Sequence, residues 1–301
     1  MTGGPAIPER KRRNSPFKRP FRLLFGLAAR MAPVQAVAFA GTLGRMAQRL
    51  GLYRCSPRAV GALFPHIPTQ RHRDIASEIA AESFRVLVIG MVGRGRTMTR
   101  LLDPAGIDHL SAAVTTQGGA VLLTWHFGSP VALSFAAEQL PIKVRSFRMK
   151  VMPELTSALV TKMKPQGRAA TLLEAVRWVR GGGVVGFAPD APDGTRPVLC
   201  PFLGRLVPVQ HGAAFIARIT GAPLVPALAV WNPRRRIVEI DCSPPVPFAD
   251  LDPRDPQAFD EELTRRIAAH FEAKARERPW LVSFQFDWYQ SLPPAPSRPE
   301  R

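Results

Sequence analysis

Short apolar runs alternate with helix-like segments from about residue 118 to residue 278. The runs AVLLTW (120–125) and VVGFAPD (184–190) follow glycines and have the length and composition of buried strands. The other predicted strands are 142–147, 223–231 and 236–242, and the predicted helices are 130–140, 153–163, 171–180, 211–220 and 259–278. The alternation predicts an α/β fold with a mixed, largely parallel central sheet flanked by helices.

The N-terminal part has a different pattern. Residues 1–20 combine Pro, Gly and charges without periodicity, which is typical of a disordered basic arm. Residues 21–100 are expected to form a helical, membrane-associating part, with helices at 21–50 and 71–92. Its 14 uncharged residues between Arg30 and Arg45 are fewer than the roughly 20 that span a bilayer. The alternative is an ordinary packed helix behind a disordered tail. Residues 101–290 then form the α/β domain, and 291–301 a disordered tail.

The charge balance narrows the class of partner. The chain has 41 Lys and Arg against 23 Asp and Glu, a formal net charge of +18, which favours a polyanionic partner. Nucleic acid is not expected, because no helix-turn-helix, basic helix or aromatic stacking strand accompanies the charge. An anionic membrane surface or an acidic carrier protein remains. The three cysteines lie far apart, so neither a disulfide framework nor a metal site is predicted.

Polar residues follow two of the predicted strands directly. His126 comes after the strand at 120–125, and Asp190 and Asp193 lie at the end of the strand at 184–190. Ligands of open α/β sheets collect at such carboxyl ends, where a histidine can act as a general base. The structural alternatives are a histidine that only packs and aspartates that only form turns. His211, before a helix, is a second possible base. Ser129 lacks the G-x-S-x-G context of a serine hydrolase, and no P-loop is present.

Several segments in a fixed order resemble one family. They are HFG after the strand at 120–125, APDAPDG leading to PFLG, GAAFIARITGAPLVP, and the late PW. Over about residues 20–290 the sequence resembles the bacterial lipid A biosynthesis (lauroyl/myristoyl) acyltransferases of the lysophospholipid acyltransferase superfamily.

The resemblance implies a glycerol-phosphate-acyltransferase-like fold without metal or cofactor. It also implies acyl transfer from acyl carrier protein or acyl-coenzyme A to a hydroxyl of a lipid or glycolipid, such as a lipid A precursor or a lysophospholipid. The expected location is the cytoplasmic face of the bacterial inner membrane, peripherally bound.

The sequence departs from the family's pattern of histidine, four residues, then Asp or Glu. His126 matches the histidine, but Val131 stands where the acid would be. Valine cannot hold an imidazole. Either Asp190 or Asp193 supplies the missing carboxylate, or His126 works with a carbonyl, or the chain is a catalytically impaired lipid-binding or partner protein.

Cations are concentrated where an acceptor phosphate would bind. Residues 141–236 contain 15 Lys and Arg against 4 Asp and Glu. Arg148 is the first candidate for a phosphate, with Arg145, Arg168 and Arg196 as further candidates, because arginine binds phosphate bidentately. A solvated basic face is the alternative. The segment VLCPFLGRLVP (198–208) is apolar with one charge and is expected to form a loop. By resemblance, its Phe202 and Gly204 lie beside the acceptor and acyl sites.

Overall fold

A computed structural model describes residues 26, 28, 30–53, 55–92, 101–130, 132–133, 136, 144–146, 161–162, 168–190 and 196–295. Within these residues, seven strands form one sheet in the order β1-β9-β8-β2-β5-β3-β4. Their bounds are β1 Leu102–Asp103, β2 Ala120–Leu123, β3 Val144–Ser146, β4 Thr161–Lys162, β5 Val184–Phe187, β8 Leu224–Asn232 and β9 Ile237–Cys242. β8, β2, β5, β3 and β4 are mutually parallel, whereas β9 is antiparallel to β8 and parallel to β1. The predicted mixed, largely parallel α/β sheet is confirmed.

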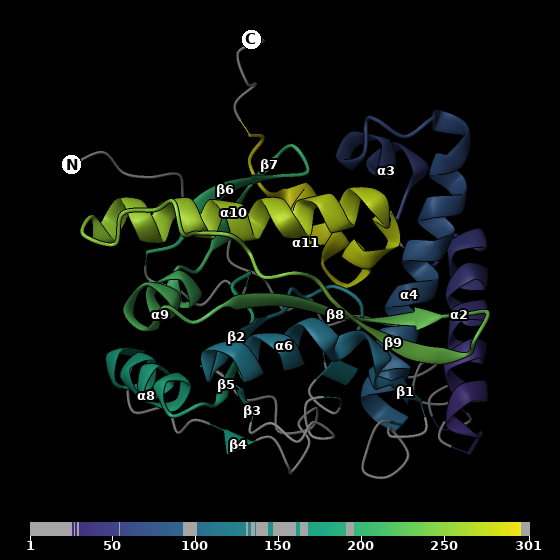
Figure 1. Ribbon diagram of the computed structural model, residues 1–301. Helices are drawn as coiled ribbons and strands as arrows, with labels where there is room; N and C mark the ends of the chain where they lie inside the picture. Colours follow the sequence, from purple (N-terminus) through teal and green to yellow (C-terminus); the bar gives the residue numbers. More distant parts are fainter. Residues whose placement is uncertain are drawn as a thin grey trace.

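Helices cover both faces of the sheet (Figure 1). They are α2 Pro33–Arg49, α3 Pro57–Leu63, α4 His72–Val92, α6 Asp108–Gln117, α8 Arg168–Arg180, α9 Gly212–Thr220, α10 Pro256–Glu277 and α11 Phe286–Ser291, with a 3₁₀ helix, η4, at Pro279–Gln285. Local signals set several ends. The Asp255 side chain accepts a hydrogen bond from the Ala258 backbone at the start of α10, and Gly221 closes α9 with a φ of 69°. Among the described residues, no helix has the length and hydropathy needed to cross a bilayer.

The core is divided into two clusters, one on each face of the sheet. Val121 and Leu123 of β2 pack with α8, α9, α10 and α11, whereas Ala120 and Leu122 pack with α2 and β9. All four residues of β2 are buried, as expected for a parallel strand covered on both sides. Helix α4 contributes its first half to one cluster and its second half to the other, so the N-terminal helices are tied to both layers.

The segment VLCPFLGRLVP, expected as a loop, forms an antiparallel hairpin of β6 Val198–Phe202 and β7 Arg205–Val209. The expectation was wrong because two prolines argue against strands and Leu-Gly is not a usual hairpin turn signal. Leu203 and Gly204 both have positive φ, 49° and 72°, as a two-residue hairpin turn requires. The C-terminal segment then pairs with the hairpin, since Leu206 N donates to Pro293 O at 2.9 Å and Ala295 N to Gly204 O at 2.9 Å.

Two predicted elements also end differently. The predicted helix 153–163 is wrong at its end, because Thr161–Lys162 forms β4, which pairs with β3; residues 153–160 lie outside the described residues. The predicted strand 184–190 ends at Phe187, after which Ala188–Asp190 turns away and Pro189 offers no backbone N–H. The division of the chain at residue 100 stays a prediction.

Candidate active site

Two neighbouring parallel strands end at the same level of the sheet. β2 pairs with β5 so that Leu123 faces Phe187, and Thr124 N continues the ladder by donating to Phe187 O at 2.9 Å. His126 and Asp190 each lie three residues beyond this last pair. The register therefore brings them together at the carboxyl edge of the sheet, where α/β proteins bind ligands.

Asp190 holds His126 at two points. Its Oδ1 lies 2.9 Å from Nδ1 of the imidazole, and its Oδ2 accepts the His126 backbone N–H at 2.9 Å. Asp190 is fully buried, whereas the His126 side chain is 34% exposed. Because a carboxylate only accepts, Nδ1 carries the proton and Nε2 carries the lone pair of the neutral ring. One end of the imidazole is thus fixed inside the protein, and the ring remains partly accessible to solvent.

A tight turn presents His126. Phe127 N donates to Trp125 O at 2.6 Å, which closes a three-residue turn centred on His126. The next residue is Gly128, with a φ of 53°, and a Cβ placed there would lie 2.3 Å from Ala229 O of β8. Ser129 N donates to the same carbonyl at 2.9 Å. Only glycine fits this approach to β8, so its presence fixes the path of the chain after His126.

Buried aromatic side chains contact Trp125, the first residue of the turn. Trp125 is fully buried and stacks on Phe202, with ring centroids 5.2 Å apart and an interplanar angle of 8°. Its indole Nε1 donates to the hydroxyl of Tyr289 at 2.8 Å. Burial, together with the nearby negative charge of Asp190, raises the pKa of Tyr289 well above its ordinary value, so the phenol stays neutral. No local sequence pattern predicts this contact, because 164 residues separate the two partners.

Residues on either side of 191–195, which lie outside the described residues, make hydrogen bonds to the two residues that precede α9. Gln210 N donates to Pro189 O at 2.7 Å, and Nδ1 of His211 lies 3.2 Å from Arg196 O. His211, considered as a second base, therefore has a ring nitrogen engaged by a backbone carbonyl. Asp193, Val131 and Arg148 lie outside the described residues.

The other predicted binding residues have varied surroundings. Phe202 is completely buried beneath Trp125, and Gly204 forms the β6–β7 turn with open space around it. Arg145 pairs with Glu174 at 3.0 Å and stacks 3.7 Å above the ring centroid of Trp178. Arg196 is exposed, and Arg168 begins α8. Phe202 and Arg145 thus contact other side chains of the protein, and the Gly204 carbonyl accepts the backbone N–H of Ala295.

Within the described part of the chain, no group of three or more His, Cys, Asp or Glu side chains is placed to hold a metal ion. The residues that do converge are a histidine and a carboxylate. Such a pair can remove a proton from a hydroxyl and stabilise the resulting imidazolium.

The fold and this pair define an α/β protein with a carboxylate-held histidine at the ends of its parallel strands, equipped for general-base chemistry. The family model of the bacterial lipid A biosynthesis acyltransferases matches residues 21–282, and the chain belongs to that family. The family implies acyltransferase activity in lipid A biosynthesis. A search of curated proteins gave no match.

Proposed function

We propose that the protein transfers a fatty acyl group from an acyl thioester to a hydroxyl of a lipid or glycolipid acceptor. The donor is acyl carrier protein or acyl-coenzyme A, and the acceptor is a lipid A precursor or a lysophospholipid. His126 is the general base and Asp190 its orienting acid. The contact of Asp190 with both the ring and the backbone of His126 carries the proposal.

The proposed reaction uses both ends of the imidazole. Nε2 of His126 takes the proton of the acceptor hydroxyl while that oxygen attacks the thioester carbonyl. The C–S bond then breaks, and the imidazolium returns the proton to the leaving thiolate. Asp190 remains ionised throughout and stabilises the imidazolium through Nδ1. The products are an acyl ester and a free thiol, so no oxidant or metal is consumed.

Asp190 is the proposed substitute for the acid that is absent at Val131. The family resemblance places the acid five residues after the histidine, in the segment after β2, where this chain has valine. Asp190 instead comes from the end of β5, and its buried carboxylate already accepts two hydrogen bonds from His126. We propose that it replaces the missing acid. Asp193, on the same loop, is the second candidate.

The acceptor's anionic group is proposed to bind arginines near the ends of β3 and β5. Arg148, Arg168 and Arg196 are the candidates, and Arg196 is the one whose exposed side chain the structure describes. Guanidinium groups suit phosphate because they bind it through paired N–H donors. Arg145, Phe202 and Gly204 are left out of this proposed site because their contacts are with the protein itself.

We also propose that the protein acts peripherally at the cytoplasmic face of the bacterial inner membrane. Residues 10–73 contain 14 Lys and Arg and no Asp or Glu. The same region exposes Met46 (50%), Leu50 (66%) and Leu52 (52%) around the end of α2. Exposed apolar side chains within an acid-free basic segment suit an anionic lipid surface.

The test is acyl transfer from labelled acyl thioesters into a bacterial lipid extract, comparing the wild type with His126→Ala. We expect transfer by the wild type and a loss of about 10²–10⁴-fold in the variant, which is the usual contribution of a general base. His66→Ala is the matched control, since His66 is exposed and contacts Arg276 rather than Asp190. Equal transfer by His126→Ala would refute the role of His126, and lipid binding without transfer would favour the impaired, lipid-binding alternative.

A further inference from the structure

The residue before His126 is anchored by a part of the chain that the family match does not reach. The match ends at residue 282, whereas Tyr289 belongs to α11. The hydroxyl of Tyr289 accepts the indole N–H of Trp125 at 2.8 Å, and both side chains are fully buried. A buried hydrogen bond of this kind is selective in position, because either partner left alone loses its only polar contact away from water.

The aromatic rings around this bond leave little room for movement. Phe202 stacks on both partners, with its ring centroid 5.2 Å from that of Trp125 and 5.3 Å from that of Tyr289. The ring planes are nearly parallel, with interplanar angles of 8° for Trp125–Phe202 and 17° for Phe202–Tyr289. Phe271 lies 5.0 Å from Trp125 on the α10 side. The orientation of the indole is therefore set by packing, and its in-plane position by the hydroxyl of Tyr289.

A displacement of Trp125 would also displace His126, the proposed base. Trp125 O and Phe127 N are joined across His126 by a 2.6 Å hydrogen bond, so the three residues move as one turn. Asp190 holds both the backbone N and Nδ1 of His126, and a tilt of the turn would lengthen both contacts. A misplacement of about 1 Å at a reacting group is enough to lower a rate about 10²-fold.

Tyr289 is also related to the other member of the pair. The charge of Asp190 contributes to raising the pKa of the phenol, so the neutral hydroxyl lies within electrostatic reach of that carboxylate. The segment after α11 is itself fixed to the β6–β7 hairpin through Pro293 and Ala295. The C-terminal part of the chain is therefore a firm anchor for the hydroxyl.

We propose that Tyr289 is a positioning residue for His126, and that its hydroxyl holds the Trp125–Phe127 turn in the geometry in which Asp190 grips the imidazole. The role in catalysis rests on the proposed acyl transfer. The geometric role does not, because it concerns the His126–Asp190 hydrogen bonds themselves.

The test compares Tyr289→Phe with Tyr53→Phe. These are the only two tyrosines of the sequence, and each substitution removes one hydroxyl from a buried or half-buried site. The Tyr53 hydroxyl contacts Ser83 and the Ser283 carbonyl instead of Trp125. We expect Tyr289→Phe to lower kcat about 10–100-fold with KM within about twofold, and Tyr53→Phe to leave kcat within about twofold.

Trp125→Phe removes the donor of the same bond. The double variant Trp125→Phe/Tyr289→Phe should lose no more in kcat than the larger of the two single variants, because both act through one contact. Unchanged kcat in Tyr289→Phe, or an equal loss in Tyr53→Phe, would overturn the proposal.

A second readout does not depend on transfer. The Nδ1 proton of His126, assigned by its absence from the proton NMR spectrum of His126→Gln, should be present in the wild type and in Tyr53→Phe. We expect it to shift or broaden in Tyr289→Phe. An unchanged resonance in Tyr289→Phe would overturn the positioning role whether or not transfer is seen. If the resonance shifts in Tyr289→Phe but the wild type transfers no acyl group, the positioning role stands and the proposed reaction is refuted.

Discussion

The end of β2 and the α2–α4 interface both bury charge, but they do so in different ways. At the end of β2, the buried Asp190 receives two hydrogen bonds from His126, whose ring is partly exposed. Between α2 and α4, Glu82 and Arg85 are both buried and pair at 3.1 Å. In that pair, Glu82 Oε1 and Arg85 Nε have no hydrogen-bond partner.

The difference distinguishes the proposed catalytic pair from a buried pair with a structural role. Burial raises the pKa of Glu82 in spite of Arg85, which shows that a perturbed carboxyl alone does not mark a site. The His126–Asp190 pair differs in that one member is buried while the other is partly exposed at the carboxyl edge of the sheet. The following predictions test this contrast, from the largest expected effect to the smallest.

Breaking the buried pair should affect folding and not chemistry. Glu82→Leu leaves Arg85 buried with Glu78 3.8 Å away, and we expect a loss of about 3 kcal/mol in the free energy of unfolding. Glu82→Leu combined with Arg85→Met removes both charges and should recover most of that loss. Urea unfolding measures the stabilities, and kcat of the folded protein should stay the same. A fall in kcat of the double variant would give the α2–α4 interface a functional role.

Gly128→Ala should disrupt the turn that carries His126. The added Cβ would lie 2.3 Å from Ala229 O at a φ of 53°. We expect a loss of stability of about 1–3 kcal/mol together with a loss of transfer. Gly221→Ala is the control, because its φ is 69° but no atom lies within 4 Å of the new Cβ. It should lose about 1 kcal/mol and keep its kcat. Equal effects on kcat in the two variants would argue against a special role of the turn.

Arg145 should behave as a structural cation. Its contacts with Glu174 and Trp178 are half-exposed, so Arg145→Gln is expected to cost about 1 kcal/mol in unfolding free energy. KM for the lipid acceptor should change less than about twofold. The matched variant is Glu174→Gln. A rise in KM of about tenfold in Arg145→Gln alone would instead place Arg145 in the acceptor site.

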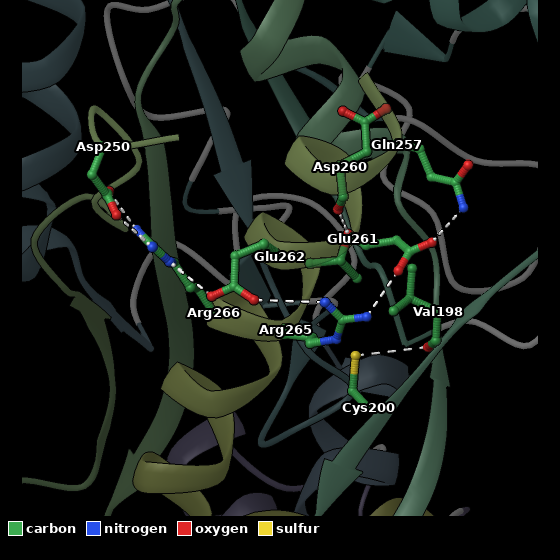
Figure 2. Close-up of polar contacts among 10 residues, drawn as sticks. Val198, Cys200, Asp250, Gln257, Asp260, Glu261, Glu262, Arg265 and Arg266 are labelled. Carbon is green, nitrogen blue, oxygen red and sulfur yellow. Dashed lines mark hydrogen bonds and ion pairs between the residues drawn. The ribbon is translucent and has the colours of Figure 1, made fainter. Parts of the chain in front are cut away.

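The smallest effect is expected at the surface of α10. Figure 2 shows Arg266 reaching Asp250 while the neighbouring Arg265 turns to Glu261. The two Arg266–Asp250 hydrogen bonds are both 2.7 Å, and they lower the pKa of Asp250 to about 2.

A lowered pKa in the folded state stabilises the protein above the unfolded carboxyl's pKa of about 3.9, and that contribution disappears as the pH falls toward about 2. Asp250→Asn should therefore be less stable than the wild type at about pH 6 and closer to it at about pH 2.5 in thermal unfolding. A constant difference across this range would show that the ion pair is not responsible. The transfer reaction should not respond, since the Asp250 carboxylate pairs with Arg266 of α10 and not with His126.

The sequence predicted the sheet and the two strand ends that carry His126 and Asp190. AVLLTW and VVGFAPD are short, apolar and bounded by glycines, so β2 and β5 were predictable, and parallel strands place their carboxyl ends together. The contact between Asp190 and His126 could not be predicted without the register of β2 against β5. The β6–β7 hairpin was not predicted, because Leu203 adopts a left-handed backbone conformation that a leucine in the sequence does not indicate.

The contact of Tyr289 with Trp125 could not be predicted from the sequence, for a related reason. A contact between residues 125 and 289 follows from the packing of α11 and β2 in one core cluster, and no local spacing encodes it. The assignments of Arg148 and Asp193 stay predictions, because these residues lie outside the described part of the chain.

The most direct measurement is kcat for acyl transfer in Asp190→Asn. Asparagine keeps the shape of the side chain and removes its charge. We expect kcat to fall about 10²–10⁴-fold and no further than in His126→Ala, because Asp190 acts through that histidine. Asp260→Asn is the matched control, since Asp260 is also buried and held at two points, by Arg218 at 2.9 and 3.1 Å. It should lose stability and keep its kcat. If Asp190→Asn kept kcat within about tenfold of the wild type, Asp190 would not be the acid that replaces the one missing at Val131.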